Sequence, residues 1–131
     1  PQKNISPEMK KRSYVEDILQ YIENNYDHTF SIQEIADVLG LERSYLYRLF
    51  KNMTGFSPQE YLLDYRIRKA CELLQNTALP IAHIARSVGY EDSLYFSRLF
   101  KQHMKSSPSS YRHKKNIETS NLPDYNSISD I

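Results

Sequence analysis

Two pairs of basic side chains recur with the same spacing in this chain of 131 residues. Arg48 is followed three residues later by Lys51, and Arg98 is followed at the same distance by Lys101. Residues three apart lie on the same face of an α-helix, so each pair would project from one surface. Arginine can bond bidentately to the O6 and N7 atoms of guanine, and a lysine one turn further along suits a phosphate. The pairs therefore predict two matching surfaces with the chemistry to contact a nucleic-acid duplex.

The sequence around each basic pair is repeated as well. Residues 32–61 and 81–111 share an Ile-Ala pair, then a glycine, then Arg-Leu-Phe-Lys, then Ser-Pro and a tyrosine. Gly40 and Gly89 are 49 residues apart, whereas Tyr61 and Tyr111 are 50 apart, so one residue is inserted after the glycine. Each copy reads as two short amphipathic helices joined by a glycine turn, which is the pattern of a helix-turn-helix unit.

The second helix of each copy should have one apolar and one polar face, because successive side chains are 100° apart. The face expected to pack in the core carries Leu46, Leu49, Phe50 and Met53 in the first copy and Phe96, Leu99 and Phe100 in the second. The outward face carries Ser44, Tyr47, Arg48 and Lys51 in the first copy and Leu94, Ser97, Arg98 and Lys101 in the second. A single outward arginine would suggest only a solvated surface. Two at equivalent positions of a repeat favour DNA binding.

Seven helices and no strand are expected, so the fold class is all-α. Val15, Ile18, Leu19 and Ile22 follow the i, i+3, i+4, i+7 spacing and predict a helix over about 12–26. Capping boxes at Ser31 and Ser57 begin later helices. The remaining helices are expected at about 32–39, 43–53, 57–74, 80–88, 92–104 and 108–111, with Glu91 or Asp92 capping the sixth.

Five segments are expected along the chain. They are a linker or disordered segment at 1–11, a first helix-turn-helix unit at 12–56, a connecting helix at 57–75, a second unit at 76–115 and a disordered tail at 116–131. The connecting helix is about 18 residues, or roughly 27 Å long, against about 34 Å for one DNA turn. A connector of that length could hold two recognition helices in successive major-groove segments.

The net charge is only +1, which by itself does not suggest nucleic acid. The repeat region is the basic part, because residues 28–115 hold 13 Lys and Arg against 8 Asp and Glu. One cysteine, Cys71, excludes an internal disulfide and fits a buried thiol in a reducing cytoplasm. The four histidines lack metal-ligand spacing, and no catalytic motif or membrane span is present. We expect neither metal nor cofactor nor enzyme activity. The start at Pro rather than Met suggests a piece of a longer protein.

Residues 31–115 resemble the DNA-binding domain of the AraC/XylS family of bacterial transcription regulators. The resemblance rests on Ile35-Ala36, Tyr45-Leu46-x-Arg48-Leu49-Phe50-Lys51, Gly55, Ser57-Pro58-x-x-Tyr61, Ile84-Ala85-x-x-Val88-Gly89-Tyr90, Tyr95-Phe96-Ser97-Arg98-x-Phe100-Lys101 and Pro108-x-x-Tyr111-Arg112. It implies homeodomain-like helix-turn-helix units that bind double-stranded promoter DNA, usually in an activator that contacts RNA polymerase. It also implies an effector domain, often for a sugar or another metabolite, that this chain lacks. With no heptad seam, the isolated domain is expected to be monomeric.

Residue roles follow from the resemblance by position. The base-reading candidates are Ser44, Tyr47, Arg48, Ser93, Leu94, Ser97 and Arg98. The phosphate-binding candidates are Arg43, Lys51, Lys101, Lys105 and Arg112. Glu42 and Glu91 depart from the family, which often has Ser near the start of the recognition helix. Leu94 departs too, since it can read only a thymine methyl group or DNA shape, so the second unit is expected to discriminate less than the first.

Two alternatives from other functional classes are also compatible with the sequence. The outward Arg and Lys faces could meet an acidic protein partner, in which case the chain is a helical interaction module. The chain could also be the DNA-targeting appendage of an enzyme. Salt-dependent retention on heparin or DNA cellulose would separate the first of these from a DNA-binding domain.

Overall fold

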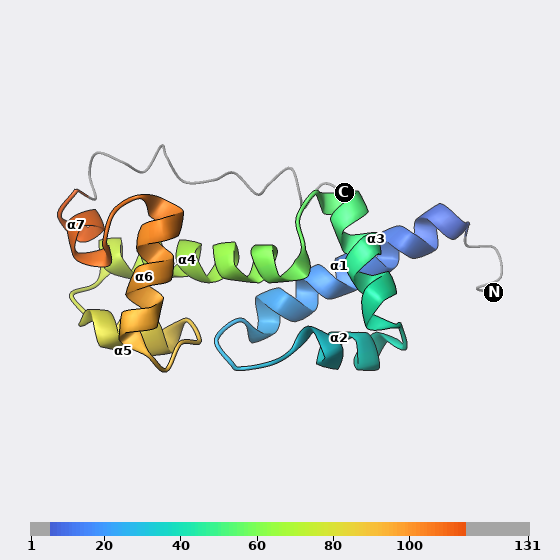
Figure 1. Ribbon diagram of the computed structural model, residues 1–131, viewed down its shortest axis with the longest axis horizontal. Coiled ribbons are helices and arrows are strands. Elements are labelled where there is room, and N and C mark those ends of the chain that lie inside the picture. Colours follow the sequence, from blue (N-terminus) through green and yellow to red (C-terminus); the bar gives the residue numbers. More distant parts are fainter. Residues whose placement is uncertain (1–5, 115–131) are drawn as a thin grey trace. The chain divides into compact units, whose positions relative to one another are not determined.

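A computed structural model of the chain describes residues 6–114, and this part is helical, with no strand (Figure 1). The described helices are α1 (Pro7–Asn25), α2 (Ile32–Leu39), α3 (Arg43–Thr54), α4 (Pro58–Asn76), α5 (Ile81–Ser87), α6 (Ser93–Met104) and α7 (Pro108–His113). The predicted all-α fold class with seven helices is confirmed. The predicted disordered tail lies outside the described residues.

The linker predicted for residues 1–11 is wrong for residues 7–11, because α1 already begins at Pro7. Proline suits the first position of a helix, and the Ser6 hydroxyl accepts the Met9 N–H at 3.1 Å. Residues 7–13 are exposed, so they carry no apolar periodicity for a sequence pattern to detect. Capping chemistry, not burial, sets this helix start.

The chain forms two compact units. Among the described residues, the first unit comprises 6–25 and 30–61, and the second comprises 26–29 and 62–114. The division falls inside α4, whose first turn belongs to the first unit and whose remainder belongs to the second. This differs from the predicted boundaries, which treated the connecting helix as a separate segment.

The first unit packs α1, α2 and α3 around one apolar core. Its buried side chains are Val15, Ile18, Leu19, Ile22, Ile32, Ile35, Ala36, Leu46, Leu49, Phe50 and Tyr61. The capping box of Ser31 and Glu34 begins α2, and Gly40 ends it in the left-handed conformation at φ 69°, as predicted. The turn between α2 and α3 is therefore fixed by local chemistry, which sets the direction in which α3 leaves.

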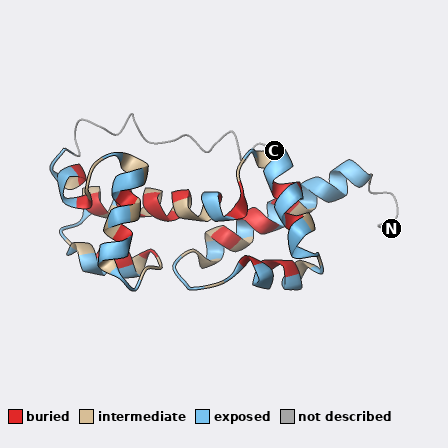
Figure 2. Cartoon of the chain, in the orientation of Figure 1, coloured by how far each residue is buried: buried red, intermediate tan, exposed pale blue. Residues whose placement is uncertain are grey.

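The second unit packs α5, α6 and α7 against most of α4. Its core is formed by Ile67, Ala70, Cys71, Leu74, Ile84, Ala85, Val88, Phe96, Phe100 and Tyr111. Figure 2 shows the buried positions as a stripe along one side of each helix, with exposed positions on the other side. This is the amphipathic pattern that the periodicity predicts, and it leaves one polar face of α6 in solvent.

Candidate nucleic-acid interface

The outward face of α3 is the candidate interface of the first unit. Leu46, Leu49 and Phe50 are buried on one side of the helix. Ser44, Tyr47, Arg48 and Lys51 are exposed on the other side. The core residues fix the rotation of α3 about its axis, so the polar face is presented by a rigid element. The expected separation of the two faces is confirmed for this helix.

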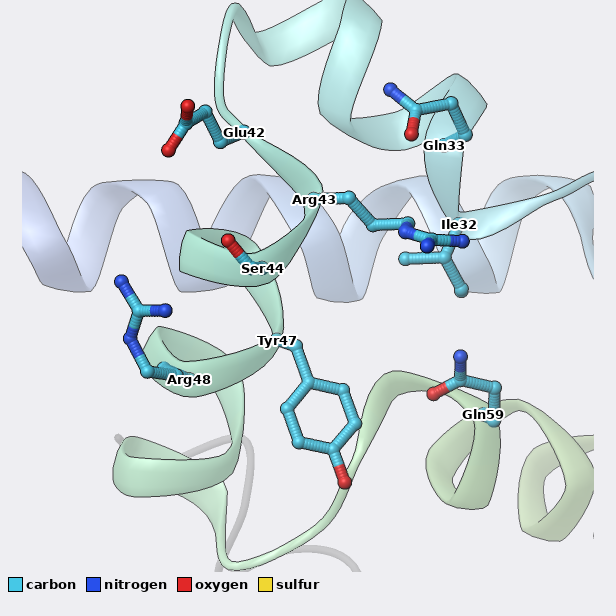
Figure 3. A pocket seen from close by; sticks show the side chains of 8 residues that line it. All are labelled: Ile32, Gln33, Glu42, Arg43, Ser44, Tyr47, Arg48 and Gln59. Carbon is cyan, nitrogen blue, oxygen red and sulfur yellow. The ribbon is translucent and has the colours of Figure 1, made fainter.

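An open hollow of about 810 Å³ adjoins this face of α3. It is lined by Ile32, Gln33, Glu42, Arg43, Ser44, Tyr47, Arg48 and Gln59. Figure 3 shows Arg43 extending towards Ile32 and Gln33, and Tyr47 lying between Arg48 and Gln59. Side chains of α2 and α4 thus line this hollow together with those of α3.

Gln33 and Gln59 line this hollow but are not among the residues that the sequence predicts for the interface. Each is the second residue after a capping serine, in the repeated sequence Ser-x-Gln-Glu at 31–34 and 57–60. Both capping boxes are formed, with the Glu60 N–H donating to Ser57 Oγ at 3.0 Å and the Ser57 N–H to Glu60 Oε1 at 2.8 Å. The repeat of this motif was the available signal, because it places both glutamines in the first turn of a capped helix.

The outward face of α6 is the candidate interface of the second unit. Phe96 and Phe100 are buried on its core side. Arg98 and Lys101 are exposed, and Leu94 is 76% exposed, which is unusual for a large apolar side chain. Ser93, Ser97 and Leu99 are half-buried. The second face therefore offers fewer hydrogen-bonding groups and one apolar contact.

The two recognition helices begin differently. Asp92 caps α6, accepting the N–H groups of Leu94 and Tyr95 at 2.9 and 3.2 Å, so of the two predicted caps Asp92 is the one used. Glu42 stands at the corresponding position of α3 and makes no side-chain cap hydrogen bond. A carboxylate covers the amides at the start of α6, whereas those of α3 lack such a cap and suit an anion better.

The lysine and arginine candidates for phosphate binding differ in their surroundings. Arg43, Lys101 and Lys105 are exposed. Lys51 Nζ lies 3.7 Å from Glu60 Oε1, but both side chains are largely in solvent, so this pair is weak and exchangeable. Lys105 is the C-cap of α6 at φ 67°, a left-handed conformation that glycine usually occupies and that Gly55 occupies at the end of α3.

Arg112 is engaged within the second unit. Its Nε donates to the Leu74 carbonyl at 3.1 Å and its Nη2 to the Thr77 carbonyl at 3.3 Å, which ties α7 to the end of α4. Arg66 binds in a similar way to the carbonyls of Tyr26 and His28, at 2.7 and 2.9 Å. Because two of its donors are used inside the protein, Arg112 is less available to a phosphate than the exposed Lys101 and Lys105.

Cys71 and Tyr111 belong to the core and not to the interface. Burial raises the pKa of the Cys71 thiol to about 11, so almost no thiolate forms near neutral pH. Burial also raises the pKa of Tyr111 well above its usual range, and its hydroxyl accepts a hydrogen bond from Gln75 Nε2 at 2.8 Å. Tyr61 is likewise buried and donates to Glu23 Oε2 at 3.0 Å. Both tyrosines are thus buried at equivalent positions of the two units.

None of the helices within residues 6–114 combines the length and the apolar composition needed to cross a bilayer. The same residues include no cluster of three or more His, Cys, Asp or Glu that could hold a metal ion.

Two helix-turn-helix units, each with an outward basic face, define a DNA-binding domain, and a family model described as a helix-turn-helix domain matches residues 35–114. The chain belongs to the AraC family of transcription regulators. The Msm operon regulatory protein of Streptococcus mutans is 41% identical over 101 residues, covering 77% of this chain and 36% of the relative. The lactose operon transcription activator of Staphylococcus xylosus is 39% identical over 103 residues, covering 79% and 37%.

Solved structures agree with this assignment. The C-terminal domain of AraT, a response regulator from Geobacillus stearothermophilus, superimposes with a TM-score of 0.76 at 36% identity, covering 85% of this chain and 88% of that one. The family is one of DNA-binding regulators and not of enzymes. The chain spans 36% and 37% of the length of the two curated relatives above.

Proposed function

We propose that this chain recognises promoter DNA by inserting α3 and α6 into the major groove, as the DNA-reading part of an activator of sugar-utilisation genes. The observation that carries the proposal is the matched exposure of Arg48 and Arg98, each opposite the buried face of its helix. A recognition helix needs a rigid apolar attachment on one side and donors for base edges on the other.

In the first unit, Arg48 binds a guanine through O6 and N7, and Ser44 and Tyr47 contact neighbouring bases or phosphates. Arg43 and the amides at the start of α3 bind the backbone. Lys51 exchanges Glu60 for a phosphate, at little cost because their pair is exposed. Gln33 and Gln59, on the walls of the hollow beside α3, supply neutral phosphate contacts that fix the orientation of the unit.

In the second unit, Arg98 binds a guanine as Arg48 does in the first. The short side chains of Ser93 and Ser97 contact bases or the DNA backbone. Leu94 packs on a thymine methyl group, which its 76% exposure allows. Lys101 and Lys105 bind phosphates. The capped start of α6 favours a smaller backbone contribution there than at α3, because the Asp92 carboxylate covers its amides.

Engagement of both units with one duplex is supported by the length of α4. The helix runs without interruption over 19 residues, or about 28 Å, against about 34 Å for a DNA turn. We propose that α3 and α6 read successive major-groove segments. If the DNA must bend to accept both, the deformation costs on the order of 1–6 kcal/mol.

The regulatory part of the proposal comes from the relatives. One of them is named as a transcription activator of a lactose operon, and another as the arabinose operon regulatory protein of Escherichia coli. By analogy we propose cytoplasmic action on a sugar operon, contact with RNA polymerase, and control by an effector domain outside this sequence. The isolated domain is proposed to bind as a monomer.

Selection from a random duplex library near physiological salt tests the proposal, because such a library offers every short operator sequence without bias. The expected result is one asymmetric motif with two blocks about a helical turn apart. The variant with Arg48→Ala should lose the first block and the variant with Arg98→Ala the second. Absence of any enriched motif, with all binding lost on adding salt, would contradict sequence-specific recognition and favour an acidic protein partner.

A further inference from the structure

The second unit contains a buried carboxylate that the DNA-reading face does not use. Asp64 of α4 is 1% exposed, and its Oδ1 contacts Nε2 of His103, near the end of α6. Its Oδ2 is buried and has no hydrogen-bond partner among the described residues. A buried, half-satisfied carboxylate costs free energy that a single contact with an imidazole offsets only in part. Stability alone is therefore a poor explanation for an aspartate at this position.

The internal repeat has an apolar residue at the position of His103. At the repeat offset of 50, His103 corresponds to Met53. The offset of 49 does not extend to α4, because the buried residues of α4 match those of α1 at an offset of 52, which places Asp64 at the exposed Arg12. The first unit thus has neither a buried carboxylate nor an imidazole at the corresponding positions.

The apolar attachment of the two recognition helices also differs. α3 buries Leu46, Leu49 and Phe50, whereas α6 buries Phe96 and Phe100 and leaves Leu99 half-buried. Apolar contacts are non-directional, so a helix held by fewer of them is less well fixed in rotation about its axis. A contact between a carboxylate and an imidazole is directional and fixes the end of the helix that bears it.

We propose that Asp64 is a positioning residue for DNA recognition: through His103 it fixes the rotation of α6, and so the direction in which Ser97 and Arg98 meet the bases. The inference rests on the proposed function of α6 as a recognition helix. According to this proposal, the sequence specificity of the second unit depends on Asp64 and His103, two residues that do not contact DNA. The first unit needs no such contact, because α3 is fixed by its larger apolar face.

The test replaces both polar partners by apolar side chains. In a double variant with Asp64→Val and His103→Met, the second substitution introduces the residue that the first unit has at Met53. Replacing both partners of a buried polar contact by apolar groups of similar shape can be nearly neutral or stabilising, so the melting temperature should hold or rise. Discrimination at the α6 block of the selected motif should nevertheless fall on the order of tenfold, as expected for a coupled contact. The α3 block should be unchanged.

A single variant, His103→Gln, separates the hydrogen bond from the mere filling of space. Its side-chain amide can donate to Asp64 Oδ1, so it should retain most of the discrimination at the α6 block. The matched single variant His103→Met leaves the carboxylate unpaired and should lower the melting temperature. Equal loss of discrimination in the Gln variant and in the double variant would overturn the positioning role.

Two further outcomes also overturn the inference. One is a double variant that selects the same two blocks as the original chain with the same discrimination. The other is a double variant that loses both blocks together with its melting transition, because the pair would then be structural. Failure of the proposed function is distinct, since the unaltered chain would then select no α6 block at all.

Discussion

Arg48 is the side chain on which sequence discrimination by the first unit should depend most. It is exposed on α3, beside the hollow that Tyr47 and Gln59 also line. Arg48→Ala should cost about 1–3 kcal/mol on the selected site and relax the preference at one base position. Arg48→Lys is the matched control, because it keeps the charge but loses the planar fork, and it should relax the same position. Equal weakening on selected and random duplexes, measured by titration at fixed salt, would assign Arg48 to the backbone instead.

Lys105 combines a strained backbone with an exposed cationic side chain. It has φ 67° where the first unit has Gly55. Lys105→Gly should therefore stabilise the fold by about 1 kcal/mol in chemical denaturation, since an L side chain is disfavoured in this conformation. The same change should weaken DNA binding and shallow the logarithmic salt dependence by about 0.9, if the lysine neutralises one phosphate. Gain of stability with an unaltered salt slope would remove Lys105 from the interface.

Single residues also show which contacts could not be predicted from the sequence. The outward positions of α3 and α6 could be predicted, because helical periodicity depends only on local spacing. The role of Arg112 could not, since its carbonyl partners Leu74 and Thr77 lie 38 and 35 residues away. The contact of Asp64 with His103 spans 39 residues and was equally hidden. Polar contacts between residues far apart in the sequence produce no periodic pattern in that sequence.

Helices and turns were more predictable than such contacts, because their ends are set by neighbours. The boxes at Ser31 and Ser57 and the glycine ends of α2 and α3 all follow local capping rules. The start of α1 was missed, because residues 7–13 extend the helix without burying an apolar face. An exposed extension of a helix can be recognised in the sequence only by its capping residue.

The turns between the paired helices should differ in their tolerance of a side chain. Gly89 has φ 103°, and a Cβ there would lie 2.7 Å from the Tyr26 carbonyl oxygen and 2.9 Å from the Arg66 guanidinium. Gly40 has φ 69° and open space around the same position. Gly89→Ala should thus cost roughly 3 kcal/mol, and Gly40→Ala about 1 kcal/mol. Chemical denaturation of both variants compares them directly, and equal losses would show that backbone strain alone, without the clash, sets the cost.

At the scale of the whole chain, two units with the same helical pattern carry different polar chemistry. In the first unit, α3 lacks a side-chain cap, and Met53 stands at the position of His103. The second has the Asp92 cap, the contact of Asp64 with His103, and the buried Cys71. The duplicated pattern preserves the fold, while these differences make the cores and the helix starts of the two units chemically unequal.

That inequality predicts that alkaline pH destabilises the second unit first. Burial raises the pKa of Cys71 from 9.0 to about 11, and it also raises the pKa of Tyr111 and of Tyr26. A group whose pKa is higher in the folded state stabilises the fold fully below its unfolded pKa, and that contribution is lost as the pH rises through the folded value. The melting temperature should therefore fall from about pH 9 upwards. Hydrogen exchange should show amides of α5 and α6 losing protection before those of α2 and α3. Cys71→Ala removes one of these groups and should flatten the decline, whereas simultaneous loss of protection in both units would refute an origin in the second core.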